Sequence, residues 1–203
     1  GYAPGRGGTH AEQLYAGIRE GAVLMSDGYE VYNGIAQSHR LIHLGCWAHT
    51  RRYFVEAEAV LPKAARRPDQ LATQFIAAIA RLYAVESKTK SKAVAERAQL
   101  REASSRPILA EIQHLLVTHR HSVTPGSLLG KALHYLEAQW PKLIRYVENG
   151  AWPIDNNLCE NAIRPFVVGR RNWLFADTVA GANASANIYS LIETCKANGV
   201  DTY

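Results

Sequence analysis

The sequence predicts an α/β fold that contains a large, entirely helical block. Two short apolar runs, at residues 22–25 and 40–46, have the length and composition of buried strands. Between residues 62 and 149 the apolar residues instead recur every three or four positions, which is the helical period. We therefore expect a first core region over 1–61, a helical insertion over 62–149, and a second core region over 150–203.

Composition and charge permit nucleic-acid binding and argue against two other classes of protein. The 203 residues include 23 Lys and Arg against 18 Asp and Glu, a net charge of +5, which is compatible with a nucleic-acid partner. No apolar run approaches the roughly 20 residues of a membrane-spanning helix, and no signal peptide is apparent. The cysteines at 46, 159 and 195 are odd in number and widely separated. They argue against a disulfide framework and favour a reducing cytoplasm.

The amino-terminal elements bring one acidic residue to the end of a strand. Thr9 and Glu12 have capping-box spacing and predict a helix that continues to about Glu20 and stops at Gly21. The strand at 22–25 then delivers Asp27 to its carboxyl end, where open α/β folds build their sites. The alternative is that Asp27 is only the turn residue of an Asp-Gly pair.

The second strand leads into a helix that combines basic and aromatic residues. Its Arg51 and Arg52 are candidates for phosphate contacts, or else belong to a solvated helix face. Cys46 and His49 have a spacing that suits a metal site. No second pair of soft ligands lies at zinc-site spacing, so a structural zinc site is the weaker interpretation.

The helical block is expected to contain helices around 71–82, 108–116 and 128–136, with a break or kink near Pro141. A lysine-rich run at 88–92 is expected to be a solvated helix junction, with a specific DNA contact as the alternative. A last amphipathic helix at 184–198 is expected to pack against the rest of the protein.

Residues 155–165 hold the second acidic candidate. Asp155 and Asn157 are typical helix-starting residues, and Pro165 disfavours helical geometry at Arg164, so we expect a helix of roughly two turns. Glu160 and Arg164 share one face of that helix. With the basic segment that follows, they suggest a phosphate-handling site. The alternative is a capping box, in which Glu160 bonds back to the backbone at the helix start.

Five sequence motifs, which follow one another in the same order as in the family, resemble the catalytic region of the bacterial DDE transposases of the insertion-sequence-66 family. They occupy residues 26–34, 45–54, 155–165, 169–176 and 188–194. The resemblance covers nearly the whole chain and is weakest in the helical block. It implies a ribonuclease H-like core in which three acidic residues hold two divalent ions, Mg²⁺ or Mn²⁺.

By this resemblance Asp27 matches the second acid and Glu160 the third, and both are expected to be catalytic residues and metal ligands. The first acid of such folds lies on the first strand. Only Glu12 and Glu20 precede Asp27, and both fall on the predicted helix. We therefore expect the ribonuclease H-like core to be incomplete at its amino terminus, in a catalytic-domain fragment.

The resemblance also implies DNA as substrate, with metal-dependent strand cleavage and strand transfer in the bacterial cytoplasm and no membrane partner. Other transposon-encoded proteins and a second copy of the chain are further candidate partners. The residues that would bind DNA are Arg51, Arg52, Arg164, Arg170, Arg171 and Trp173. The alternative to a transposase is a catalytically dead DNA-binding remnant of one.

The 203 residues by themselves are expected not to cleave DNA, because two carboxylates offer fewer hard ligands than three. The complete product of the gene is expected to cleave. Strand cleavage of a transposon-end duplex with Mg²⁺ or Mn²⁺, by each protein in parallel, measures the difference. Cleavage by the 203 residues that depends on both Asp27 and Glu160 would contradict the expectation.

Overall fold

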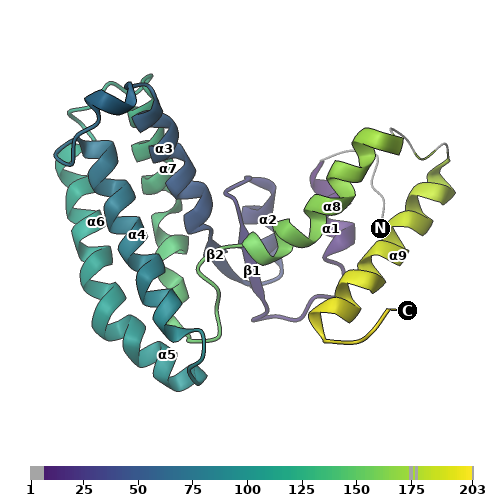
Figure 1. The fold of residues 1–203 in the computed structure, drawn as a ribbon. Coiled ribbons are helices and arrows are strands. Elements are labelled where there is room, and N and C mark those ends of the chain that lie inside the picture. The colour runs from purple at the N-terminus through teal and green to yellow at the C-terminus, as the bar shows by residue number, and fades with distance from the viewer. Residues whose placement is uncertain (1–6, 174–175, 177, 203) are drawn as a thin grey trace.

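Helices on both sides of a small central sheet make up most of a computed structural model, which describes residues 7–173, 176 and 178–202 (Figure 1). A helical bundle lies on one side of the sheet. On the other side lie α1 (Gly8–Leu14), α8 (Asn157–Trp173) and α9 (Val179–Ala197). Among the described residues, no helix combines the length and apolarity needed to cross a bilayer.

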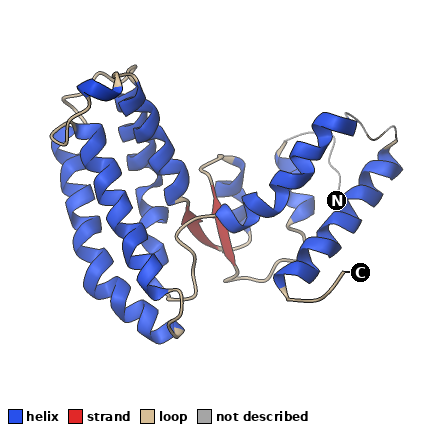
Figure 2. Cartoon of the chain, in the orientation of Figure 1, coloured by secondary structure: helices blue, strands red, loops and turns tan. Residues whose placement is uncertain are grey.

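The sheet of the described chain consists of β1 (Val23–Ser26) and β2 (Ile42–Gly45), which pair in parallel (Figure 2). Parallel strands need a crossover connection, and α2 (Val31–Ser38) provides it. Ile35 and Ala36 of α2 form a small core with Leu24 and Leu41 at the two strands. Because both strands run the same way, the residues after Ser26 and after Gly45 lie at one edge of the sheet.

The main hydrophobic core lies between α3 (Trp47–Ala59), α4 (Leu71–Thr89), α6 (Arg106–His119) and α7 (Leu128–Leu143). All four helices contribute fully buried side chains, among them Trp47, Phe54, Phe75, Ile79, Leu82, Ile112 and Leu136. The rings of Phe54 and Phe75 stack with centroids 4.4 Å apart. Helix α3, which follows β2 directly, thus packs within the bundle.

The three expected helices at 71–82, 108–116 and 128–136 are confirmed as α4, α6 and α7. All regular elements between residues 62 and 149 are helical, including two 3-10 segments, Lys63–Ala65 and Ile144–Glu148. The division at residues 61 and 149 remains a prediction, since α3 shares its core with these helices. The ribonuclease H-like core also remains a prediction; the structure supports a mixed fold with one small parallel sheet.

A buried arginine connects several helical segments of the bundle. A π-helical segment, Arg101–Ser105, joins α5 (Val94–Leu100) to α6. The Arg101 side chain is fully buried and donates to both carboxylate oxygens of Glu86, at 2.8 and 2.6 Å. It also donates to the carbonyl oxygens of Tyr146 and Asn149, at 2.8 Å each. One guanidinium therefore holds α4, the π-helical segment and the segment after α7 together.

Two helices near the ends of the chain differ from the sequence predictions. Helix α1 ends at Leu14 and not near Glu20, and Gly7, not Thr9, stands at its amino-terminal cap. Gly17 has a φ of +80°, a left-handed conformation that suits glycine and is incompatible with a helix that continues toward Glu20.

Helix α8 was predicted to end near Arg164, but it runs through Pro165 to Trp173. Proline removes one backbone donor and restricts the preceding residue, yet this restriction is a preference and does not forbid a helix. Helix α9 was predicted to be packing material, and its described residues pack only in part. The ring of Tyr189 contacts that of Phe166 on α8, with centroids 5.3 Å apart. None of the described residues of α9 is fully buried, and Ile188 and Leu191 are 59% and 67% exposed.

The substitution Arg101→Ala is expected to lower the free energy of unfolding by about 3–5 kcal/mol, because it leaves the largely covered carboxylate of Glu86, 15% exposed, without its partner. The matched control is Arg106→Ala, which breaks an exposed pair with Glu102 and is expected to cost at most about 1 kcal/mol. Urea unfolding of both variants measures the difference. Equal losses would show that the Arg101 contacts add nothing beyond an ordinary surface ion pair.

Candidate functional site

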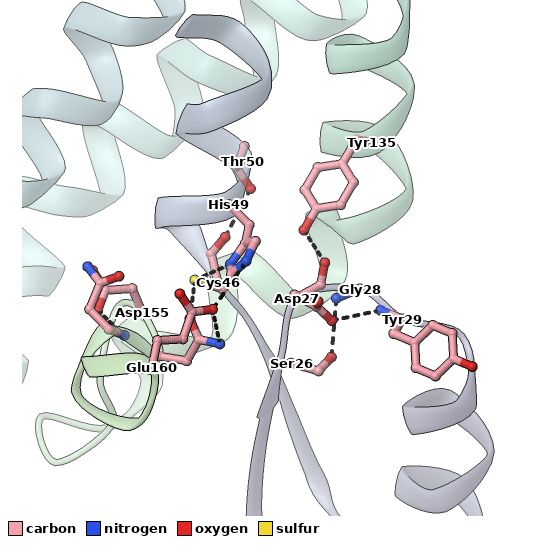
Figure 3. A network of polar contacts seen from close by, with 12 residues as sticks. Ser26, Asp27, Gly28, Tyr29, Cys46, His49, Thr50, Tyr135, Asp155 and Glu160 are labelled. Atoms are coloured by element: carbon pink, nitrogen blue, oxygen red, sulfur yellow. Dashed lines mark hydrogen bonds and ion pairs between the residues drawn. The ribbon is translucent and has the colours of Figure 1, made fainter. Parts of the chain in front are cut away.

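The candidate site lies where the carboxyl ends of β1 and β2 meet the start of α8 (Figure 3). Asp27 directly follows β1, and Glu160 lies in the first turn of α8. Both line one cavity of about 450 Å³, together with Asp155, Asn156 and other residues. Two acidic residues that are far apart in the sequence therefore line one cavity.

A tight turn and a tyrosine hold Asp27 in place. Its Oδ1 accepts a hydrogen bond from the backbone N–H of Tyr29 at 3.1 Å, so the turn role considered for this aspartate is real. Gly28 has a φ of +95°, and a Cβ there would lie 3.0 Å from the side chain of Gln139. The hydroxyl of Tyr135, on α7, donates to the Asp27 carbonyl oxygen at 2.5 Å. The hydrogen bond of the turn uses Oδ1 of Asp27, and Oδ2 takes no part in it.

A second tyrosine of the bundle reaches the loop before α8. The Tyr83 hydroxyl, on α4, donates to Asp155 Oδ2 at 2.7 Å. Asp155 also accepts from the backbone N–H of Asn157 at 3.0 Å and from its side chain at 2.8 Å, so Asp155 caps α8. Burial, followed by the bond to Asp155, raises the pKa of Tyr83 above its ordinary range. The hydroxyl therefore remains a donor.

Glu160 is held by side chains and not by a capping box. Its Oε1 lies 3.3 Å from His49 Nε2 and accepts from Asn156 Nδ2 at 3.2 Å. In a capping box the backbone N–H of Asn157 would donate to Glu160, but it donates to Asp155. The capping-box alternative is thus not what the structure shows, and Glu160 is directed toward α3.

Cys46 and His49 contact each other and the start of α8. The Cys46 thiol donates to Asn156 Oδ1 at 3.0 Å, and His49 Nδ1 lies 3.2 Å from Cys46 Sγ. Burial raises the pKa of the Cys46 thiol, which favours the protonated form over the thiolate that a metal would need. In the described part of the chain, no group of three or more His, Cys, Asp or Glu side chains is arranged to hold a metal ion.

Two features of this site were not predicted from the sequence. His49 was considered only as a weak zinc ligand, and Asn156 was given no role of its own. The spacing of Cys46 and His49, considered only for a metal site, brings their side chains into contact with each other. The contact of His49 with Glu160 joins segments remote in sequence, and no local pattern could have indicated it.

The basic residues proposed to bind DNA are only partly described. Arg51 and Arg52 are exposed on α3, and Arg164 is exposed on α8. The charge of Arg51 acts on Tyr83, and that of Arg52 acts on Tyr135, so both lie near the tyrosines that hold the acidic loops. The side chains of Arg170, Arg171 and Trp173 lie outside the described part of the structure.

Comparison with known proteins identifies relatives of this sequence. The family model described as "Transposase IS66 family" matches residues 1–184. Uncharacterized protein y4qI of Sinorhizobium fredii is 33% identical over 98% of this chain and 37% of its own length. Uncharacterized protein y4jD of the same organism is 27% identical over 100% of this chain and 39% of its own length. The chain spans about two-fifths of these relatives, and no solved structure matches it.

A buried histidine links the two strands beneath the site. His43 Nε2, on β2, lies 2.8 Å from the hydroxyl oxygen of Ser26, the last residue of β1. Burial, followed by the charges of Lys142 and Arg145, lowers the pKa of His43 to about 4. The imidazole is therefore neutral in the folded protein at pH 7.

This shift predicts a loss of stability in mild acid. The unfolded chain protonates His43 below its ordinary pKa of about 6.5, while the folded chain resists until about pH 4. Between these values the unfolded state binds more protons, so stability falls as the pH falls. From pH 7 to 4.5 the wild type is expected to lose about 2–3 kcal/mol more than His43→Gln. Urea unfolding at both pH values measures this, and equal losses in the two proteins would contradict it.

Proposed function

Because this chain belongs to the transposase IS66 family, we propose that it supplies two acidic residues of a metal-dependent site that cleaves and transfers DNA strands. The observation that carries the proposal is that Asp27 and Glu160 line the same cavity at the end of the parallel strands. In α/β folds this edge is where ligands bind. The relatives are longer than this chain, so the activity is proposed for the complete gene product.

The donor set fits a hard divalent ion such as Mg²⁺ or Mn²⁺. The hydrogen bonds described above go to Oδ1 of Asp27 and to Oε1 of Glu160, which leaves the second oxygen of each carboxylate for a ligand. Magnesium keeps several of its waters and binds through one or two carboxylates together with substrate phosphates. A cavity of about 450 Å³ has room for those waters. The family resemblance leads us to expect two ions in the complete site.

Such ions, when bound, stabilise the attacking and leaving oxygens of an in-line displacement at phosphorus. The residues of this chain would do the rest by position. The turn at Gly28 and the bond from Tyr135 fix the backbone at Asp27. Asn156 and His49 fix Glu160. This arrangement limits the motion of both carboxylates, and well-positioned groups are what a displacement of this kind requires.

The exposed arginines are proposed to bind the DNA backbone. Arg51 and Arg52 on α3 and Arg164 on α8 lie on the two helices that contribute His49 and Glu160. A guanidinium presents a planar fork of donors that matches a phosphate. Arg170, Arg171 and Trp173 are assigned to the same role by family resemblance. Phosphate contacts of this kind position a duplex without reading its sequence.

In the complete gene product, Asp27→Ala and Glu160→Ala are each expected to reduce Mg²⁺-dependent cleavage of a transposon-end duplex by at least about a hundredfold, because each removes a direct ligand. The matched control is Asp69→Ala, which removes an exposed carboxylate just before α4 and is expected to leave the rate unchanged. Gel analysis of labelled duplexes measures cleavage.

Cleavage that survives both substitutions would remove Asp27 and Glu160 from the site. A complete gene product that binds DNA in a salt-dependent manner, but never cleaves it with Mg²⁺ or Mn²⁺, would favour the inactive DNA-binding remnant instead.

A further inference from the structure

Four side chains from two remote segments form a closed ring of contacts beside the cavity. Cys46 and His49 come from the junction of β2 and α3, and Asn156 and Glu160 come from the start of α8. Cys46 contacts Asn156, Asn156 contacts Glu160, Glu160 contacts His49, and His49 contacts Cys46, all within 3.0–3.3 Å. We infer that His49 is a positioning residue, which holds Glu160 through Oε1 so that the second carboxylate oxygen serves the metal. This inference rests on the proposed function.

Each ring nitrogen of His49 has a separate partner, and this fixes the orientation of the imidazole. Nε2 faces Glu160 Oε1 at 3.3 Å, and the tautomer with its proton on Nε2 donates there; Nδ1 faces Cys46 Sγ at 3.2 Å, where it competes with Asn156 Oδ1 for the single thiol proton. A ring flip would exchange nitrogen for carbon at both contacts and lose both. Asn156 is used in the same way, because its amide nitrogen goes to Glu160 and its oxygen goes to Cys46.

Rigid neighbours anchor the histidine. Trp47 and Thr50, on either side of it in α3, are fully buried. The Trp47 indole N–H donates to the Leu143 carbonyl oxygen at 3.0 Å, and the Thr50 hydroxyl donates to the Cys46 carbonyl oxygen at 3.2 Å. The His49 side chain is only 14% exposed, whereas that of Glu160 is 37% exposed. The buried partner is therefore the fixed one, and the partner that reaches the cavity is the one being held.

In this inference His49 contacts Glu160, a ligand of the metal, and does not contact the metal itself. Residues that hydrogen-bond a metal-ligating carboxylate orient it, and their removal typically costs about 10–100-fold in metal affinity. A purely structural role would be different, since the ring would then only pack α8 against α3. That role predicts a loss of stability without a selective loss of metal binding.

The test measures Mn²⁺ affinity of the complete gene product by electron paramagnetic resonance of the free ion, and counts only the binding that Glu160→Ala abolishes. His49→Ala is expected to weaken this binding about tenfold. His49→Gln carries an amide nitrogen close to the position of Nε2, so it is expected to restore affinity to within about threefold of wild type. His49→Asn places its amide near Nδ1, toward Cys46, and is expected to resemble His49→Ala. The control His121→Ala removes an exposed histidine after α6 and should change nothing.

The outcomes separate this inference from the proposed function. Mn²⁺ binding that needs Asp27 and Glu160 but is unchanged in His49→Ala overturns the role of His49 and leaves the proposed function intact. Equal affinities of the Gln and Asn variants overturn the assignment to Nε2. If no Mn²⁺ binding is found that requires Asp27 and Glu160, both the role of His49 and the proposed function are overturned. Urea unfolding of every variant accompanies the titrations, and a loss of stability with unchanged affinity supports packing alone and overturns the inference.

Discussion

The burial of Trp47 is the constraint on which the site depends. Its indole lies in the core of the helical bundle, 0% exposed, and its N–H bonds to the carbonyl oxygen of Leu143 on α7. Its backbone N–H donates to the carbonyl oxygen of Ile154 at 3.2 Å, which places the approach to α8 beside the end of β2. One residue thus joins the strand, the bundle and the loop before Glu160. A fully buried indole also contributes several kcal/mol of hydrophobic stabilisation, so this junction is costly to open.

From this junction the bundle reaches both acidic loops. Tyr135 from α7 holds the carbonyl of Asp27, and Tyr83 from α4 holds the carboxylate of Asp155 at the start of α8. Burial keeps both hydroxyls protonated, so neither tyrosine loses its donor at neutral pH. The loops that carry Asp27 and Asp155 are therefore both held in position by the core of the helical bundle. A change in how α4 and α7 pack against α3, the helix that contacts both, would alter the positions of the Asp27 and Asp155 loops, even though no residue of the cavity itself had changed.

Sequence patterns predicted the features that depend on a few neighbouring residues. They did not predict features that depend on contacts with segments remote in the sequence. Both strands, the bundle helices and the turn at Asp27 follow from periodicity and from residue preferences over a few positions. No element was predicted for residues 31–38, where α2 buries Ile35 and Ala36. The apolar face of α9 predicted packing, but amphipathicity does not indicate how much of such a face a neighbour covers, and only part of this one is covered. The contact of Glu160 with His49 depends on the whole bundle, and no short segment encodes it.

An acidic residue can hold the local structure and also bind a ligand. The hydrogen bonds distinguish Asp155, which has a structural role, from Asp27 and Glu160, which can have both roles. Asp155 uses both of its carboxylate oxygens, one for the backbone of Asn157 and one for Tyr83, so both oxygens serve to hold the start of α8. The hydrogen bonds to Asp27 and Glu160 go to one oxygen of each. A carboxylate that is anchored through one oxygen has lost most of its freedom to rotate, and a ligand at the other oxygen then pays little further entropy of ordering. For Asp27 the local turn is therefore a means of preparing the site and not an alternative to it.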